Sequence, residues 1–516
     1  MSFSKNTPLV LAILDGWGVA EPSPANAMSQ GNTPFLEYLA SRYRSYKLHA
    51  SGEGVGLPAH APGNSELGHL TLGTGRVFYQ HVQRIQRTIA SGKFFSNRSL
   101  LRAVEHARTH NSRIHIFSLL SFKSRYGHRD HPSALLNFLK EQSFCNSIYL
   151  HLILEGTDQS EWLAHINYVV EKMKKMPFVS IGSISGSDAH LNRDENGDLT
   201  ETLRTAFLFG GIEPETTDAF KILRRMRQMP ARSGQWGPEI CAPNALIHDN
   251  DSIIFTHFEN LRIALFVSAL KGSSPYDFAK EGVKNVYAVS FAGNALPALD
   301  IAFPEEEISG TLADVISGLG HCQFKIAETE KYAHATYFFN GGRIVPEKNE
   351  DWIFVPSKTV QSFAEYPACS AIEITSRALQ YLKTKRYSFA VANYANADLT
   401  AHTGDFGAAM RACEVVDSCL KELARAVLKM GGCLLVTADH GNAENMMGAD
   451  GITANMHHTD SLVPLIIAGE DFFLPKEKPL YSDSLVPEGT LADVAPTILK
   501  IVDLPIPSAM TGNVLV

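Results

Sequence analysis

The chain has 516 residues, of which 45% are hydrophobic and 19% are charged. A chain of this length can bury a large core and is too long for one ordinary compact domain, so we expect two domains. The formal net charge of -8 at pH 7 argues against a nucleic-acid-binding protein, and an anionic substrate would need a local group of cations.

The first predicted element is a strand at residues 10–14, a continuous apolar run that ends in Asp15 and Gly16. Such a run is typical of a buried parallel strand. Open α/β sheets bind their ligands at the carboxyl ends of these strands, so Asp15 is well placed for chemistry.

The middle of the chain alternates between strand and helix patterns. Strands are predicted at residues 113–120, 148–154, 178–181 and 252–255, and helices at residues 132–140, 161–176 and 261–270. This alternation predicts a second α/β domain, inserted into the first and joined to it near residues 75–79 and 303–306. We therefore expect one domain at residues 1–79 and 306–516, and the inserted domain at residues 80–305.

Two more strands follow the insertion, at residues 389–393 and 433–437, and a long helical pattern at residues 406–430 lies between them. Strand, helix and strand predict a βαβ unit, so the expected fold class is α/β. The first strand leads to Asp398, and the second leads to Asp439 and His440.

The seven cysteines are an odd number without Cys-x-x-Cys spacing, which favours reduced thiols in a cytosolic protein over a disulfide framework. No segment approaches the ~20 consecutive apolar residues that a membrane span needs. We expect a cytoplasmic protein that binds neither membranes nor nucleic acid. The sequence leaves the oligomeric state open, and a monomer is our expectation.

Several residues have the chemistry of metal ligands. Asp398 and His402 are four residues apart, which puts both side chains on one face of a helical turn. Carboxylates mixed with imidazoles suit Mn²⁺ or Zn²⁺ better than Mg²⁺. The full set has enough ligands for two divalent ions, and we expect Mn²⁺ with Zn²⁺ or Mg²⁺ as alternatives. Its members are Asp15, Ser65, Asp398, His402, Asp439, His440 and His458.

Ser65 is the candidate nucleophile. It lies in Gly-Asn-Ser-Glu-Leu-Gly-His at residues 63–69, where small residues allow a phosphate to approach backbone N–H groups. A hydroxyl of ordinary pKa is a poor nucleophile, and metal coordination activates it by favouring the alkoxide. Each piece alone has an ordinary interpretation, since Asp-Gly after a strand is usually a turn. Their joint occurrence in this order is specific.

Eight segments resemble the cofactor-independent phosphoglycerate mutases of the alkaline phosphatase superfamily: residues 14–18, 63–69, 327–334, 338–342, 393–398, 402–404, 437–444 and 491–499. The resemblance implies an alkaline-phosphatase-like discontinuous domain with the inserted domain binding substrate. It also implies an enzyme that interconverts 3-phosphoglycerate and 2-phosphoglycerate, in glycolysis and gluconeogenesis, through a phosphoserine at Ser65.

The same resemblance assigns roles to single residues. It implies one metal ion at Asp398, His402 and His458, and another at Asp15, Ser65, Asp439 and His440. His457 is adjacent to His458, and the family's flanking pattern is altered there. Lys331 corresponds to a phosphate-contacting lysine, and Asp158 to the aspartate that shuttles the proton of the glycerate hydroxyl. Arg193 and Arg262 correspond to two arginines that bind the glycerate part, work for which the planar guanidinium is suited.

Four positions of the substrate site depart from the family pattern. Tyr126 stands where the family has a histidine, and Thr157, Ser187 and Glu259 stand where it has arginines. His128 or Arg125 could take over the role of that histidine if the loop shifts locally, and Lys123 adds a cation nearby. A charge-assisted hydrogen bond contributes roughly 1.5–3 kcal/mol, so three missing contacts would remove on the order of 5 kcal/mol from glycerate retention.

A weaker hold on the glycerate leaves two alternatives open. The first is a phosphatase, or a mutase for another small phosphomonoester, because water could take the phosphoryl group if the alcohol escaped. The second is a binding or regulatory protein that keeps the fold without turnover. The complete set of metal ligands argues against the second alternative.

Overall fold

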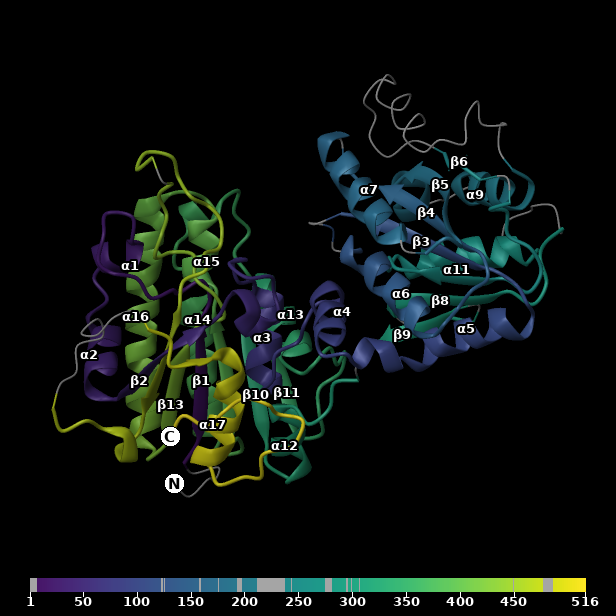
Figure 1. Cartoon of the computed structure of the whole chain (residues 1–516). Coiled ribbons are helices and arrows are strands. Elements are labelled where there is room, and N and C mark those ends of the chain that lie inside the picture. The colour runs from purple at the N-terminus through teal and green to yellow at the C-terminus, as the bar shows by residue number, and fades with distance from the viewer. Residues whose placement is uncertain are drawn as a thin grey trace. The chain divides into compact units, whose positions relative to one another are not determined.

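The computed structural model describes residues 7–121, 124, 126–156, 159–174, 176–192, 197–210, 237–242, 244–273, 281–293, 296–297, 299–305, 307–448, 450–476 and 486–516. The chain divides into two compact units, Met1–Tyr79 with Glu307–Val516, and Gln80–Glu306. Each unit is a sheet packed with helices, which confirms the α/β fold class (Figure 1). Among the described residues, no helix is both long and apolar enough to cross a membrane.

The first unit is built on an eight-stranded sheet in the order β11-β10-β12-β1-β13-β14-β2-β15. Its parallel part consists of β11 (Glu350–Val355), β10 (Gln323–Glu328), β12 (Phe389–Tyr394), β1 (Leu9–Leu14) and β13 (Cys433–Thr437). β14 (Val463–Ala468) runs antiparallel to β13 and to β2 (Arg44–His49), and β15 (Gly489–Thr490) is parallel to β2.

The three strands predicted in this unit are confirmed as β1, β12 and β13, and the predicted helix between the last two as α16 (Phe406–Lys429). β1 lies between β12 and β13, so the strands joined by α16 are not neighbours in the sheet. The sequence pattern could not show this, because β1 comes from the other end of the chain.

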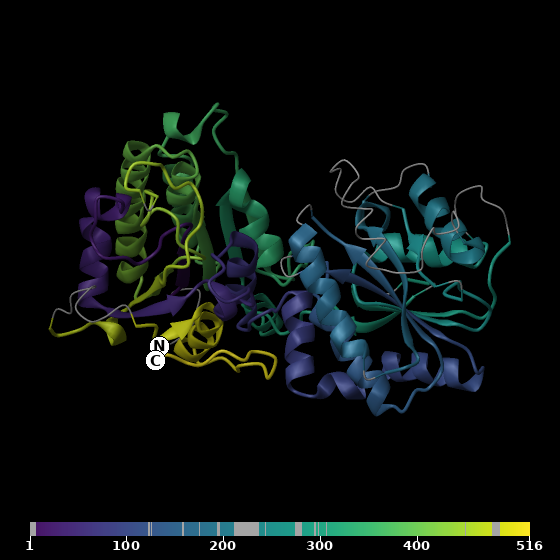
Figure 2. The same ribbon diagram turned by 45° about the horizontal axis from the view of Figure 1, so that its top comes forward.

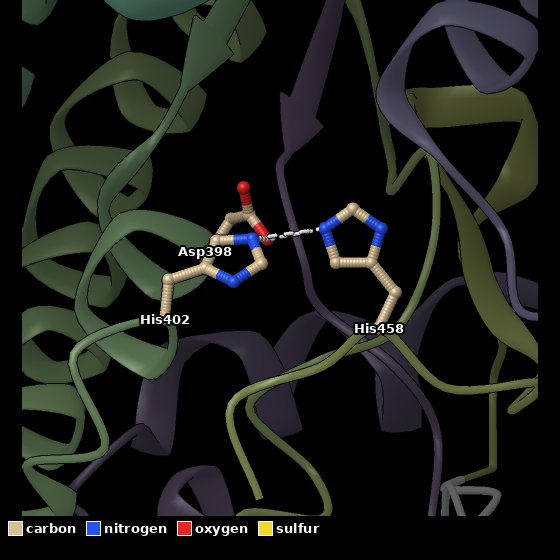
Figure 3. A group of neighbouring side chains, drawn as sticks. All are labelled: Asp398, His402 and His458. Atoms are coloured by element: carbon tan, nitrogen blue, oxygen red, sulfur yellow. Dashed lines mark hydrogen bonds and ion pairs between the residues drawn. The ribbon is translucent and has the colours of Figure 1, made fainter. Parts of the chain in front are cut away.

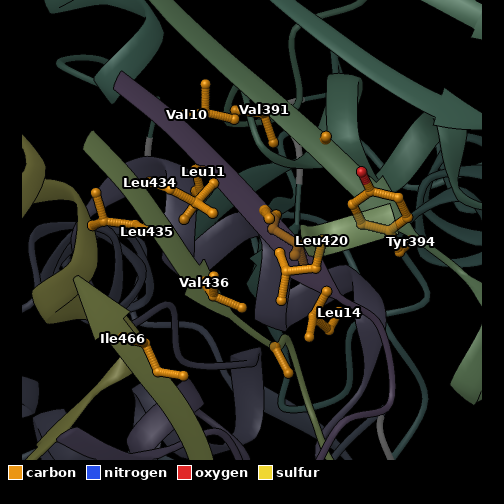
Figure 4. Close-up of a cluster of buried hydrophobic side chains, with 14 of the residues drawn as sticks. Val10, Leu11, Leu14, Val391, Tyr394, Leu420, Leu434, Leu435, Val436 and Ile466 are labelled. Atoms are coloured by element: carbon orange, nitrogen blue, oxygen red, sulfur yellow. The ribbon is translucent and has the colours of Figure 1, made fainter. Parts of the chain in front are cut away.

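The core of the first unit explains why these segments are strands. All six residues of β1 are buried, as expected for a parallel strand with helices on both faces of its sheet (Figure 2). Figure 4 shows Val10 and Leu11 of β1 packed among Val391, Leu434 and Leu420, the last from α16. The first unit also contains α1 (Ala27–Gln30), α2 (Pro34–Arg42), α3 (Ser65–Thr74), α12 (Leu312–Gly318), α13 (Thr329–Ala333), the π-helix η3 (His334–Phe338), α14 (Ala371–Lys383), α15 (Asn396–Ala401) and α17 (Val494–Ile501).

The second unit has a seven-stranded sheet in the order β6-β5-β4-β3-β7-β8-β9, parallel except for β6. The strands are β3 (Ile114–Leu120), β4 (Ile148–Leu154), β5 (Val179–Gly186), β6 (Glu239–Ile240), β7 (Ser252–Phe255), β8 (Tyr287–Gly293) and β9 (Asp300–Pro304). The helices are α4 (His81–Ala90), α5 (Arg98–Thr109), α6 (Asp130–Glu141), α7 (Gln159–Met173), α8 (Asp188–Leu191), α9 (Asp198–Phe209) and α11 (Asn260–Leu270).

The predicted strands of this unit are confirmed as β3, β4, β5 and β7, and the predicted helices as α6, α7 and α11. β5 continues beyond its predicted end at residue 181, to Gly186. The continuation contains two fully buried serines, Ser183 and Ser185, whose hydroxyls bond buried histidines. A hydrophobicity pattern does not register such a segment as a strand.

Candidate metal centre

Four adjacent parallel strands of the first sheet, β10, β12, β1 and β13, bring the candidate residues to one edge. Lys331 in α13 follows β10, Asp398 in α15 follows β12, and Asp15 directly follows β1. Asp439 and His440 come just after β13. These residues are far apart in the sequence, but they lie close together because the carboxyl ends of the parallel strands meet at one edge of the sheet.

Asp398, His402 and His458 form one group, in which the three side chains point at one another (Figure 3). Asp398 Oδ1 lies 3.2 Å from His402 Nε2 and 3.3 Å from His458 Nε2, and the two Nε2 atoms are 3.0 Å apart. His402 Nδ1 is 2.8 Å from the carbonyl oxygen of Met456, and His458 Nδ1 is 2.9 Å from that of Gly63. A backbone carbonyl accepts only from an Nδ1–H, so each Nε2 keeps the lone pair that binds a metal.

His458, rather than His457, belongs to this group. The side chain of His457 is exposed, whereas His458 Nε2 is 3.3 Å from Asp398 Oδ1. Asn442 supports the carboxylate from the other side, because its Nδ2 donates to Asp398 Oδ1 at 2.8 Å.

Asp15, Asp439 and His440 form a second group, and all three are buried. His440 Nε2 lies 3.4 Å from Asp439 Oδ2 and 3.7 Å from Asp15 Oδ1. Asp439 Oδ1 accepts the backbone N–H groups of Gly16 and His440, at 3.3 and 3.0 Å. The His440 ring stacks on that of His458, with 3.8 Å between their centroids, so the two groups are in direct contact.

Ser65 lies where the two groups meet. It is the first residue of α3, whose N-terminus is capped by Asn64. Its hydroxyl oxygen is 2.9 Å from His440 Nε2 and accepts from Lys331 Nζ at 2.8 Å. Ser65 is buried in the described structure, with 6% of its surface exposed, so the surrounding groups act on its hydroxyl with little screening by water.

Lys331 connects the two groups. Its ammonium lies 2.6 Å from Asp15 Oδ1 in the second group and 2.6 Å from Asp398 Oδ2 in the first. Burial alone would lower the pKa of Lys331, but the carboxylates of Asp15, Asp398 and Asp439 outweigh it and raise that pKa above its ordinary value. Lys331 is therefore a cation at neutral pH.

The carboxylates respond in different directions. Burial would raise the pKa of Asp398, but Lys331 and the neighbouring imidazoles of His402 and His458 hold that pKa well below its ordinary value. Burial, reinforced by Asp439, raises the pKa of Asp15.

Each group offers a carboxylate oxygen and at least one imidazole nitrogen, with the ligand atoms of a group all within 4.8 Å of one another. Mixed oxygen and nitrogen ligands of this kind fit a divalent transition metal or zinc. The donor set and the fixed ring orientations therefore suit metal binding in both groups.

Four residues beside these candidate ligands were not singled out from the sequence: His69, Asn393, Asn442 and Glu444. His69 Nδ1 is 3.2 Å from Asp439 Oδ2, and Asn393 Nδ2 donates to Asp15 Oδ2 at 2.9 Å. Glu444 accepts the backbone N–H groups of Asn442 and Gly18, at 2.8 and 3.2 Å. The only sequence signal for His69 was its position, four residues after Ser65 on what proves to be one helix face.

Of the substrate-binding residues predicted in the second unit, Arg262 and Tyr126 lie in the described part of the chain. Arg262 is buried, and its guanidinium donates to Thr200 Oγ1 at 2.9 Å and to the carbonyl oxygen of Ala189 at 2.8 Å. Tyr126 is half-buried, and its carbonyl oxygen accepts from Phe258 N at 3.0 Å.

Two further departures from the family pattern, Ser187 and Glu259, also lie in the described part of the chain. Ser187 is buried immediately before α8, and Glu259 immediately precedes α11. His128, a candidate replacement for Tyr126, is buried with its Nδ1 3.5 Å from Asp130 Oδ2. The remaining residues lie outside the described part of the chain: Lys123, Arg125, Thr157, Asp158 and Arg193.

Comparisons with known proteins place these features in context. A family model, the metalloenzyme superfamily, matches residues 7–506. A protein of Aster yellows witches'-broom phytoplasma, named 2,3-bisphosphoglycerate-independent phosphoglycerate mutase, is 36% identical over 98% of this chain and 98% of its own. A protein of the same name from Clostridium botulinum is 34% identical over 99% of both chains.

Among solved structures, a phosphoglycerate mutase of Leishmania mexicana, crystallised at low cobalt concentration, has a TM-score of 0.56 and 24% sequence identity, covering 98% of this chain and 97% of its own. At that identity the likeness concerns the fold.

Proposed function

This chain belongs to the metalloenzyme superfamily and, within it, to the 2,3-bisphosphoglycerate-independent phosphoglycerate mutases, and we propose that it interconverts 3-phosphoglycerate and 2-phosphoglycerate through a phosphoserine at Ser65. The observation that carries this proposal is the position of the Ser65 hydroxyl, within 2.9 Å of both Lys331 Nζ and His440 Nε2. We place the reaction in glycolysis and gluconeogenesis, in the cytoplasm, and expect the protein to act as a monomer without nucleic acid or membrane partners.

The chemistry has two half-reactions. The Ser65 hydroxyl loses its proton and its oxygen forms a bond to phosphorus, while the bond from phosphorus to the glycerate oxygen breaks and that oxygen takes a proton. The other glycerate hydroxyl then loses its proton and attacks the phosphoserine, which frees Ser65. Lys331 is placed to stabilise the negative charge that develops on the transferring group, because its ammonium already lies beside the nucleophile.

We propose that Asp398, His402 and His458 hold one divalent ion and that Asp15, Ser65, Asp439 and His440 hold another, with Mn²⁺ as the favoured ion and Zn²⁺ or Mg²⁺ as alternatives. When bound, such ions favour the deprotonated serine and neutralise phosphoryl oxygens. The chain's own part is to present neutral imidazoles, which the hydrogen bonds from His402 and His458 to backbone carbonyls support.

The roles of the second unit are also proposals. Asp158 is the proposed acid and base for the glycerate hydroxyls, and Arg193 and Arg262 the proposed ligands of the glycerate part, with Tyr126 in the position of the family's histidine. Arg262 already uses its guanidinium within the unit, so binding substrate would require it to share these bonds with an anion.

A second candidate function, a metal-dependent phosphatase or a mutase for another small phosphomonoester, is favoured by one observation. Ser187 and Glu259 replace two of the family's arginines, and a glutamate at such a position repels an anionic substrate. If the glycerate leaves while the phosphoryl group is on Ser65, water completes the reaction.

One experiment separates the two candidates. The purified protein is incubated with 3-phosphoglycerate and Mn²⁺, and phosphorus NMR follows 2-phosphoglycerate and free phosphate in the same sample. A mutase forms 2-phosphoglycerate with little phosphate. Accumulation of phosphate without 2-phosphoglycerate supports the phosphatase and rejects the mutase.

A further inference from the structure

One imidazole outside the proposed ligands contacts Ser65 and Asp439 directly and reaches Asp15 through Asn393. His69 is fully buried, and its Nδ1 lies 2.9 Å from the carbonyl oxygen of Ser65 and 3.2 Å from Asp439 Oδ2. Its Nε2 lies 2.9 Å from Asn393 Nδ2, and the same amide nitrogen donates to Asp15 Oδ2 at 2.9 Å.

These contacts define the direction of every hydrogen bond. The carbonyl and the carboxylate beside His69 Nδ1 can only accept, so Nδ1 carries the hydrogen. The Nε2 atom is then an acceptor, and it takes one hydrogen of the Asn393 amide while Asp15 takes the other. Hydrogen bonds therefore connect Asp15 through Asn393 to His69 and His69 to the carbonyl oxygen of Ser65, and His69 Nδ1 also lies in close contact with Asp439 Oδ2.

The helix that carries His69 is pressed directly against Asp439. A Cβ atom built on Gly68 would lie 2.5 Å from the carbonyl oxygen of Asp439, so only glycine permits this approach. Ser65 begins the same helix, and the contact therefore connects the nucleophile to Asp439 through less than two helical turns.

We infer that His69 and Asn393 are positioning residues that hold Asp15, Asp439 and Ser65 in the arrangement that binds the second ion. This inference rests on the proposed function, because it assumes the two ligand groups named there. The contacts of His69 within the described part of the chain do not include Asp398, His402 or His458, so the first group does not depend on it directly. Loss of His69 should weaken the second site and spare the first.

The test measures Mn²⁺ binding by equilibrium dialysis and electron paramagnetic resonance, with no substrate present. His69→Leu removes both hydrogen-bonding atoms. Loss of a residue that orients metal ligands typically costs about 10–100-fold in metal affinity. We expect the second ion to bind about 10–100-fold more weakly in this variant, the first ion to bind as in wild type, and the spectroscopic coupling between two neighbouring ions to disappear at low Mn²⁺.

Two further variants remain informative if His69→Leu does not fold. His69→Asn places an amide near the position of Nδ1 and can still donate to Asp439, whereas His69→Gln reaches the position of Nε2 and can still accept from Asn393. Asparagine should recover more of the second-site affinity than glutamine, because the contact with Asp439 acts on a proposed ligand without an intermediary.

The matched control is His334→Phe. His334 lies beside His69, with 5.8 Å between ring centroids, and stacks on Phe338, so phenylalanine keeps the ring packing. This variant should bind both ions as wild type does. Wild-type affinity for the second ion in His69→Leu or in both amide variants would overturn the inference, and so would an equal loss of both ions. A wild-type protein that binds fewer than two ions would overturn the proposed ligand assignment itself.

Discussion

Replacement of Lys331 with methionine should destabilise the metal-free first unit. The ammonium lies 2.6 Å from Asp15 Oδ1 and 2.6 Å from Asp398 Oδ2, and only 6% of the lysine side chain is exposed. Methionine has a similar length but no charge, so the two carboxylates lose their shared partner. Removing one member of a buried ion pair costs about 3–5 kcal/mol, and we expect a loss of that size in the free energy of unfolding.

Metal binding should reduce this loss, because divalent ions neutralise the same carboxylates. The measurement is urea unfolding of wild type and variant, in chelator and in excess Mn²⁺, with hydrogen exchange of peptides from α3 and α15 reporting on the first unit. Lys348→Met is the control, because Lys348 is exposed in the same unit. A loss below about 1 kcal/mol, the range of a surface ion pair, would refute the reasoning. So would an equal loss with and without Mn²⁺.

Three other outcomes follow from the proposed site. Ser65→Ala should form no phosphoenzyme when incubated with radiolabelled substrate, and turnover near the wild-type rate would exclude the covalent route. Asp398 raises the pKa of His402 through a hydrogen bond, and it raises the pKa of His458 against the opposing effect of burial. Protons should therefore begin to displace metal from these imidazoles just above the ordinary histidine pKa of about 6.5, and displace more as the pH falls. Added Mn²⁺ should partly restore the activity lost in acid, and a loss insensitive to Mn²⁺ would point away from these ligands. Glu259→Arg should raise the ratio of 2-phosphoglycerate formed to phosphate released, and an unchanged ratio at normal metal content would contradict its assignment to the substrate site.

The strands found from the sequence are dominated by apolar residues. β1 is an unbroken apolar run and β4 has a single polar residue, His151, and every residue of both strands is buried. β10 was not predicted, because its six buried residues include Lys325 and Glu328. Lys325 is paired with Glu350 of the neighbouring strand β11 inside the core. A buried ion pair between two strands leaves no hydrophobic pattern in either segment.

The candidate site was readable for a different reason. Asp15, Asp439 and His440 follow apolar strands, so their place at the sheet edge could be expected from strand positions alone. The supporting role of His69 could not, because it depends on how closely α3 approaches Asp439. That approach is set by tertiary packing between Gly68 and Asp439, which lie far apart in the sequence.

The discontinuity of the first unit bears on how the site forms. Asp15 and Ser65 precede the inserted unit, Gln80–Glu306, and the other proposed ligands follow it. β1, from the N-terminal piece, pairs with β12 and β13 from the C-terminal piece. The central strand can therefore join its sheet only after the chain has closed across the whole insertion, and a shorter effective loop lowers the entropy cost of closure. Folding of the inserted unit supplies that shortening, because the Arg84 guanidinium donates to the carbonyl oxygen of Pro304 at 2.7 Å, which brings the two ends of the unit together. The proposed ion of the second group needs ligands from both pieces of the chain, so its binding stabilises the closed arrangement. The proposed ion at Asp398, His402 and His458 needs ligands from the C-terminal piece alone.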